Sequence, residues 1–233
     1  MTSRERLLTV MKGELPDCVP CCPDVSNMVP CRLTGKPFWE IYAYQDPPLW
    51  KAYIDAIKHF GIDGGFELYD FGPVDILTGV RSGLLERIVL RRPDGSFATQ
   101  YYDELTGEWS RHVIVYTAGN PPATGVLPQK LGLPTIPTDW EALSGVRSWP
   151  VGMELWHLIR AEMGDQGVLG IESGCSTAVL NSPEDVYSYH DDPEPWRRKT
   201  LEAIRWVEER MEKIARMSPK PDFLFCGGSG TLV

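Results

Sequence analysis

Three amphipathic helical segments along the chain are each followed at once by a short, almost continuously apolar run. These runs lack the polar–apolar alternation of a strand with one exposed face, so each is expected to be covered on both faces. Buried strands that alternate with helices predict an α/β fold built on a parallel sheet. The helical segments are 49–60, 152–163 and 195–217, and the runs that follow them are 66–71, 167–172 and 222–226.

A different pattern separates the first of these units from the second. Over residues 85–117, β-forming stretches alternate with two turns, Pro93-Asp94-Gly95 and Leu105-Thr106-Gly107. An Asp-Gly turn between β-forming stretches is a strong hairpin signal. We therefore expect an antiparallel β-meander of three strands. Together with the loop or lid that follows it, residues 85–137 form an insertion within one domain, residues 1–233.

The meander segment also carries a run of aromatic residues, Tyr101 and Tyr102 with Trp109. Large flat rings serve either as the core of a small sheet or as a platform for a flat ligand. We favour the core of the meander for these three side chains.

Two further segments carry signals for the start of a helix. Ser3 precedes a segment of mixed charge that stops at Gly13. Thr138 stands three residues before Glu141, in the arrangement of a capping box. A short helix is expected after each of them.

Charge and hydropathy exclude two classes of partner. The chain has 23 Lys and Arg residues against 32 Asp and Glu, a formal net charge of -9, and no basic block, which argues against nucleic acid. No apolar run approaches the roughly 20 residues that a membrane-spanning helix needs, and the first residues lack the apolar stretch of a signal peptide. A cytoplasmic location without a membrane partner is the expectation.

The cysteines are expected to be reduced thiols, because the chain carries no export signal. One C-x-x-C pair has a spacing that structural zinc sites use. Neither a second pair nor a nearby histidine follows it, and the apolar stretch around it is typical of a short strand, so buried thiols are expected instead. The six cysteines are Cys18, Cys21, Cys22, Cys31, Cys175 and Cys226.

The chain stops at Val233, directly after its third apolar run. A (β/α)8 barrel needs eight strand–helix units over about 250 residues, and only three such units are evident in this sequence. We therefore expect a truncated sequence, with part of its chemistry beyond Val233.

Five segments, in this order, resemble the uroporphyrinogen decarboxylase superfamily. The resemblance spans the whole chain and is weak between residues 80 and 135. It implies an incomplete (β/α)8 barrel of the TIM type, with its site at the carboxyl ends of the strands. The segments are Thr2-Ser-Arg-Glu-Arg-Leu-Leu with Gly13-Glu-Leu-Pro-Asp17-Cys-Val-Pro20, His59-Phe-Gly-Ile-Asp63, Gly170-Ile-Glu-Ser-Gly-Cys-Ser-Thr177, Ser182-Pro-Glu-Asp, and Gly227-Gly-Ser-Gly-Thr-Leu.

Two chemistries share that barrel: cofactor-free decarboxylation of uroporphyrinogen, and zinc-dependent methyl transfer between a corrinoid protein and a thiol. Where the decarboxylase has arginines for the carboxylates of its substrate, the corresponding segment here supplies only Arg32. Asn181 stands where the decarboxylase has tyrosine, and Glu172 adds a negative charge. A polyanionic tetrapyrrole needs cationic partners. The resemblance therefore favours methyl transfer, with decarboxylation as the alternative.

In the methyltransferase branch, zinc is held by an H-x-C pair and a later cysteine. These positions are expected beyond Val233, so no metal ligand is expected in this chain. The implied partners are a small-molecule or tetrapyrrole substrate and a corrinoid protein, and a homodimer is compatible with the resemblance. A third hypothesis, from another class, is a non-catalytic remnant of a barrel.

The resemblance and the strand ends together nominate five site residues. Asp70 and Glu172 end predicted strands and are the candidate catalytic residues, because a carboxylate there can orient an N–H or O–H group of the substrate. Asp75, Asn181 and Ser229 are the candidate substrate-binding residues, and Ser229 lies in a Gly-rich segment whose backbone amides can bind an anion. Structural roles in turns and helix caps remain the alternative for both acids and for Asp75.

Overall fold

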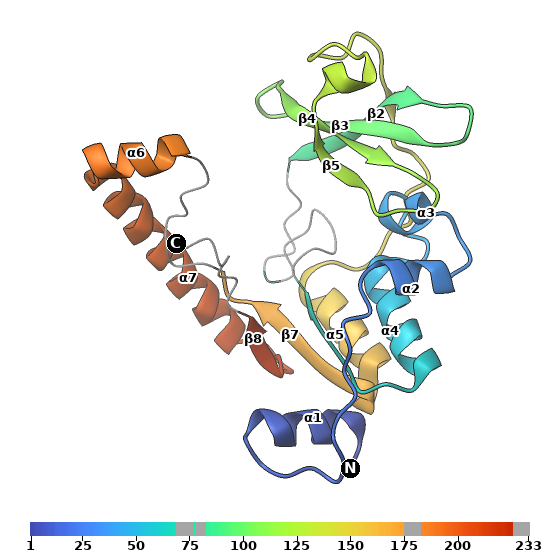
Figure 1. The fold of residues 1–233 in the computed structure, drawn as a ribbon, viewed down its shortest axis with the longest axis vertical. Coiled ribbons are helices and arrows are strands. Elements are labelled where there is room, and N and C mark those ends of the chain that lie inside the picture. Colours follow the sequence, from blue (N-terminus) through green and yellow to red (C-terminus); the bar gives the residue numbers. More distant parts are fainter. Residues whose placement is uncertain (69–76, 78–82, 175–182, 226–233) are drawn as a thin grey trace.

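The computed structural model describes residues 1–68, 77, 83–174 and 183–225. Within this part the strands form two sheets, one parallel and one antiparallel (Figure 1). The mixed α/β architecture that the sequence predicts is confirmed. Neither sheet closes on itself among the described residues, so the barrel stays a prediction.

The parallel sheet has three strands in the order β1-β7-β8. Its strands are β1 (Gly64–Leu68), β7 (Gly167–Glu172) and β8 (Phe223–Phe225). Each strand is preceded by a helix, as expected: α4 (Leu49–Phe60), α5 (Gly152–Met163) and α7 (Glu194–Ala215). Helix α4 ends where Gly61 adopts a left-handed conformation, with φ 62°, which glycine enters without steric cost.

The apolar faces of these helices bury one face of the parallel sheet. Each fully buried Leu, Ile or Val side chain contributes roughly 1.5–3 kcal/mol through removal of its apolar surface from water. Because side chains alternate along a strand, Val168 and Glu172 of β7 face away from these helices. The buried cluster comprises Trp50, Ile54, Ile57, Trp156, Ile159, Met163, Leu169, Ile171, Ile214 and Met217.

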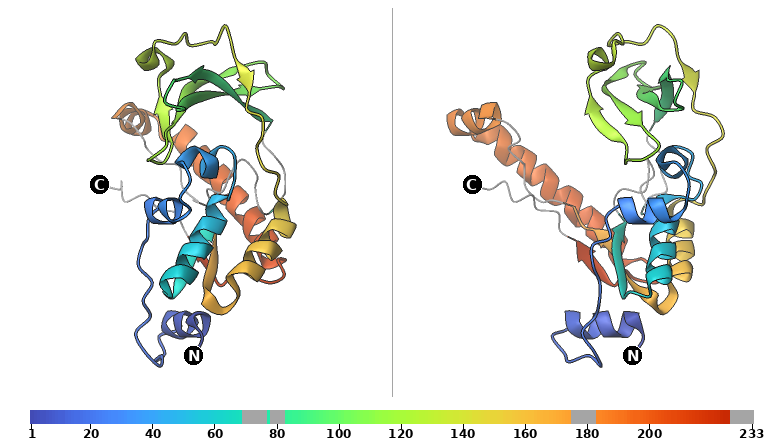
Figure 2. Two further views of the ribbon diagram at one scale, coloured as in Figure 1. Left: turned by 90° about the vertical axis from the view of Figure 1, so that its right-hand side faces the viewer. Right: turned by 45° about the vertical axis from the view of Figure 1, so that its right-hand side comes forward.

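Helix α1 (Ser3–Met11) lies at the amino-terminal end of the parallel sheet (Figure 2). Its N-cap is Thr2 rather than Ser3, and the Thr2 hydroxyl and the Glu5 carboxylate form a capping box. Arg6 donates from Nη1 to the buried carboxylate of Asp63, which stands just before β1, at 2.5 Å. Arg6 also donates from Nε to Asp17 at 2.7 Å, so one guanidinium joins α1, the following loop and β1.

A second carboxylate ties α1 to the other edge of the sheet. Asp222, whose side chain is 2% exposed, stands just before β8 and pairs with Arg4 of α1 and Arg160 of α5. It also accepts a hydrogen bond from the backbone amide of Leu169 at 2.9 Å. Burial by itself would raise the pKa of Asp222, but these hydrogen bonds lower it below its ordinary value.

The antiparallel sheet has five strands in the order β5-β4-β3-β2-β6, where three were expected. One of its faces packs on the chain around α3 (Phe38–Tyr42) through Phe97 and Tyr116, and the loop after β5 covers the other. The loop or lid region contains β5 and a short 3-10 helix, Pro128–Leu131. The strands are β2 (Leu84–Arg91), β3 (Phe97–Asp103), β4 (Trp109–Tyr116), β5 (Ala123–Val126) and β6 (Glu141–Ala142).

The helix expected after Thr138 is wrong, because this segment forms the edge strand β6. Its residues pair with β2, with Ala142 opposite Arg87. The Glu141 carboxylate accepts a hydrogen bond from Arg91 on β2 instead of capping a helix. Partners 50 residues away in sequence thus outweigh a local capping pattern.

The burial expected for the cysteines is wrong for three of the four that the structure describes. Cys18, Cys21 and Cys22 are exposed, and only Cys31 is buried. The amide of Cys21 donates to Asp63 Oδ2 at 2.8 Å and its carbonyl accepts from the Asp63 amide at 2.9 Å. These two hydrogen bonds hold the segment around Cys21 at the surface, beside the start of β1. Cys175 and Cys226 lie outside the described residues.

The remaining helices are α2 (Met28–Leu33), which packs on α4, and α6 (Pro183–Asp191), which lies at the amino-terminal end of α7. In Figure 2 the α6–α7 pair projects away from the rest of the molecule. Among the described residues, every helix is too short or too polar to cross a membrane.

Replacing Asp222 by alanine is expected to lower the free energy of unfolding by about 3–5 kcal/mol, because it leaves Arg4 and Arg160 as unpaired, partly buried charges. Urea unfolding followed by circular dichroism measures the loss. The matched control is Asp55→Ala, which breaks an exposed pair with Lys51 and should cost at most about 0.5 kcal/mol. Equal losses in both variants would contradict the role given to Asp222.

The lowered pKa of Asp222 also predicts a pH dependence of stability. A carboxylate with a lowered folded-state pKa contributes its full stability above the unfolded pKa, and the contribution is lost as the pH falls through the folded value. The difference in unfolding free energy between the wild type and Asp222→Asn should therefore shrink below about pH 4. Urea unfolding of both proteins between neutral and acidic pH checks this, and a constant difference would count against it.

Candidate functional site

The carboxyl ends of β1, β7 and β8 meet at one edge of the parallel sheet, since all three strands run in the same direction (Figure 1). Ligands of parallel α/β sheets bind at this edge, where the loops after the strands converge. Helix α1 and its ion pairs occupy the opposite, amino-terminal end. The carboxyl edge is therefore the candidate site.

Glu172 lies at this edge as the last residue of β7 and is half-buried. Leu169 and Ile171 pack in the helical core, so alternation places Glu172 on the opposite face of the strand. Its backbone carbonyl accepts a hydrogen bond from Arg210 Nε of α7 at 2.9 Å. The structure thus puts this predicted catalytic residue at the edge where a substrate would bind.

The chain just after Glu172 is held firmly in place. Ser173 is buried, and both its amide and its hydroxyl donate to the carbonyl of Phe225, at 2.8 and 3.1 Å. These bonds join the carboxyl ends of β7 and β8. Gly174 then turns with φ 91°, and a Cβ atom built there would lie 2.1 Å from a ring carbon of Trp206. Only glycine fits this turn under the tryptophan.

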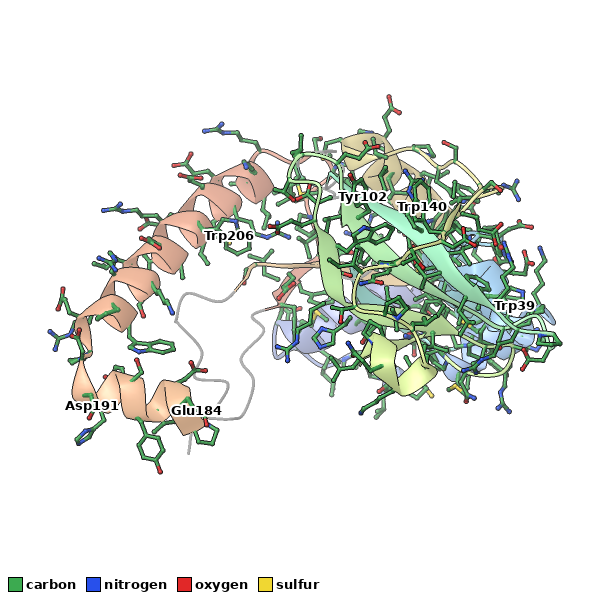
Figure 3. All side chains as sticks on the ribbon, turned by 90° about the horizontal axis from the view of Figure 1, so that it is seen from above. Trp39, Tyr102, Trp140, Glu184, Asp191 and Trp206 are labelled. Carbon is green, nitrogen blue, oxygen red and sulfur yellow. The ribbon has the colours of Figure 1, made fainter. Side chains whose placement is uncertain are left out.

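Trp206 and Arg210 are four residues apart on α7 and both contact the chain around Gly174. Trp206 packs against Gly174, and Arg210 binds the carbonyl of Glu172. The guanidinium of Arg210 lies 5.4 Å from the centre of the Trp206 ring, a cation–π contact. The ring of Trp206 is 52% exposed, so it contributes a flat apolar surface beside the carboxyl edge (Figure 3). Sequence reasoning did not single out either residue. Their i, i+4 spacing is a signal for mutual contact, but it does not say that this face of α7 meets β7.

Helix α7 extends well past the carboxyl edge. Its 22 residues span about 33 Å, whereas the six residues of β7 span about 20 Å. The first half of α7, together with α6, therefore extends beyond the carboxyl edge (Figures 1 and 2). The exposed apolar side chains of this extension are Val186, Tyr187, Tyr189 and Leu201.

Four of the five predicted site residues, Asp70, Asp75, Asn181 and Ser229, lie outside the described residues. The structure therefore places only Glu172, and it adds Trp206 and Arg210 as its neighbours.

Zinc has no matching set of donors in the described part of the chain. No three His, Cys, Asp or Glu side chains there gather closely enough to hold a metal ion. The described side chains therefore do not fit a resident zinc ion.

Comparison of the chain with protein-family models, with curated proteins and with solved structures finds no match.

Gly174→Ala is expected to destabilise the protein by about 1–3 kcal/mol, because the new methyl group collides with Trp206. In a Trp206→Ala background the collision is gone, and only the backbone strain of about 1 kcal/mol should remain. A double-mutant cycle of urea unfolding free energies measures the coupling between the two sites. Additive effects would show that the ring does not press on this turn.

Proposed function

We propose that the chain belongs to an enzyme of the uroporphyrinogen decarboxylase superfamily that carries out methyl transfer at the carboxyl edge of the β1-β7-β8 sheet. The observation that carries the proposal is the ion-pair network of Arg6, Asp17 and Asp63. Arg6 and Asp17 come from the first segment of the resemblance and Asp63 ends the second, and these two segments lie far apart in sequence. Their contact supplies a physical reason for the pieces to occur together.

The same network supports the location of the site. With α1 bound across the amino-terminal ends of β1 and β8 by Asp63 and Asp222, the carboxyl edge is the end of the sheet left for substrate. In barrels of this class, residues at the amino-terminal end serve stability and those at the carboxyl ends serve catalysis.

The charge at the carboxyl edge favours methyl transfer over porphyrinogen decarboxylation. Among the described residues that we place there, Arg210 is the cation, and its Nε already donates to the carbonyl of Glu172. The Glu172 carboxylate would repel a carboxylate-bearing tetrapyrrole, whereas it would attract the ammonium group of an amino-acid thiol. If the acceptor carries a neutral alcohol or amide instead of an ammonium group, its O–H or N–H would donate a charge-assisted hydrogen bond to the Glu172 carboxylate.

In this proposal each described residue has a limited task. Glu172 binds and orients the polar group of the acceptor. Trp206 and Arg210 hold the turn at Gly174, and Trp206 excludes water from one side. The zinc ion of such a transfer keeps a thiol deprotonated at neutral pH when it is bound. Its ligands would have to be residues other than the described ones.

The first step of the test is to sequence the gene downstream of the Val233 codon. The second is to assay the protein that the whole reading frame encodes. The product is incubated with methylcob(III)alamin and a thiol, with zinc and with a chelator. Uroporphyrinogen is supplied in parallel and carbon dioxide is measured. We expect an H-x-C pair with a later cysteine, and loss of methylcobalamin that requires both thiol and zinc. Carbon dioxide release without methyl transfer would favour decarboxylation, and a stop codon at position 234 would leave the non-catalytic remnant.

Glu172→Gln tests the residue itself. It should slow methyl transfer by at least about tenfold, the effect of losing one hydrogen bond to a charged group, with little change in unfolding free energy. Glu202→Gln is the matched control, since Glu202 is an exposed carboxylate on α7. Equal activity of Glu172→Gln and the wild type would remove Glu172 from the site.

A further inference from the structure

Two buried polar atoms of the antiparallel sheet lack a hydrogen-bond partner within the described part of the chain: Arg87 Nε and Gln100 Oε1. Arg87 on β2 and Gln100 on β3 are directly opposite each other in the register. Paired residues of neighbouring antiparallel strands project to the same face of the sheet. A donor and an acceptor therefore lie next to each other on one face, both without a partner. Buried groups of this kind are rare and need a physical explanation.

The orientation of the Gln100 amide is determined by its surroundings. Nε2 donates to the carbonyl of Ser110 at 2.5 Å and to the carbonyl of Thr135 at 3.0 Å. Exchanging the oxygen and nitrogen would place an acceptor against two carbonyl oxygens, so the amide cannot turn round. Oε1 is therefore held as an acceptor for something other than the neighbouring backbone.

A row of three aromatic rings begins at Arg87. The guanidinium of Arg87 lies 4.8 Å from the centre of the Trp140 ring. The Trp140 ring is 6.2 Å from that of Trp109, which is 5.0 Å from that of Tyr102. Figure 3 labels Tyr102 of β3 and Trp140, which stands just before β6. Trp140 is 48% exposed, so part of its surface is accessible from solvent.

We propose that this face of the antiparallel sheet binds a nucleobase, presented as a free nucleoside. The edge of a nucleobase carries an acceptor beside a donor, which complements Arg87 Nε and Gln100 Oε1, and its flat ring stacks on an aromatic side chain. The carboxylate of Glu104 lies 4.0 Å from Arg87 Nη2, so the site presents little net charge. A neutral ligand matches this balance better than a phosphate does.

The ligand enters by displacing the segment that covers the sheet. Gln100 is 1% exposed because residues 132–140 lie over it, held by the hydrogen bond from Gln100 to Thr135 and by the contact of Trp140 with Arg87. This segment belongs to the region after β4 that the sequence predicts to be a loop or lid. The inference does not depend on the proposed methyl transfer, since the residues that carry it all belong to the antiparallel sheet and its covering segment.

Isothermal titration calorimetry of the whole chain with adenosine, guanosine, cytidine and uridine tests the proposal. We expect saturable binding at one site by at least one of the four. Arg87→Met and Gln100→Leu should each weaken this binding by at least about tenfold, as expected for loss of a hydrogen bond to a buried group. Arg111→Met is the matched control, because it removes an exposed arginine of the same sheet, and its affinity should equal that of the wild type.

Gln100→Leu keeps the experiment decisive if Arg87→Met does not fold. Leucine has a similar volume and removes the unpartnered oxygen, but it also removes the hydrogen bonds from Nε2 to the carbonyls of Ser110 and Thr135. We expect this variant to lose about 1–3 kcal/mol of unfolding free energy for each carbonyl left without a donor, and its binding is measured under conditions where circular dichroism shows it to be folded. Three results would overturn the proposal: no saturable binding of any nucleoside, unchanged binding by Gln100→Leu, or binding of glucose or galactose in place of all four nucleosides. The first would mean that buried water alone serves Arg87 and Gln100.

Discussion

The buried carboxylate of Asp222 organises the parallel sheet. Removing an ionised carboxylate from water costs several kcal/mol unless cations and hydrogen-bond donors replace the lost hydration. Arg4, Arg160 and the amide of Leu169 supply these partners. They belong to α1, α5 and β7, so one side chain just before β8 relates three other elements to one another. A rotation of any of these elements would leave a buried charge without its partner.

This arrangement also separates the two ends of the sheet by role. At the amino-terminal end, Asp222 and Asp63 bind the arginines of α1 and close the edge. At the carboxyl end, the hydrogen bonds of Ser173 to Phe225 and the contact of Trp206 with Gly174 order the backbone next to Glu172. Glu172 is therefore a half-buried acid on a rigid backbone, and a side chain that orients a substrate needs such a fixed position.

The antiparallel sheet is stabilised by hydrogen bonds among its own side chains. On its α3 side, the carboxylate of Glu86 accepts hydrogen bonds from Thr99 and from Tyr116, the latter at 2.6 Å. Burial, with a smaller contribution from the negative charge of Glu86, raises the pKa of Tyr101 to about 12, so this tyrosine is neutral at physiological pH. The α3 side also holds one buried polar atom without a partner, the Tyr42 hydroxyl, whereas the opposite side has two such atoms on paired residues, Arg87 Nε and Gln100 Oε1. The pairing of a donor and an acceptor is the reason for placing a ligand on the covered side.

The sequence by itself determined the elements whose signals are local. The apolar spacing and the glycines at either end delimit α5 and β7 at the residues predicted, and the Asp-Gly turn predicts the hairpin of β2 and β3. Tertiary structure alone decided the features that depend on distant partners. Glu141 became part of a strand because Arg91 and the backbone of β2 outweigh its capping pattern, and Cys21 became exposed because Asp63 binds its backbone. The same holds at the candidate site: alternation along β7 follows from the sequence, but the face of α7 that brings Trp206 and Arg210 to Glu172 is set by packing, because helical spacing alone leaves the direction of a helix face open.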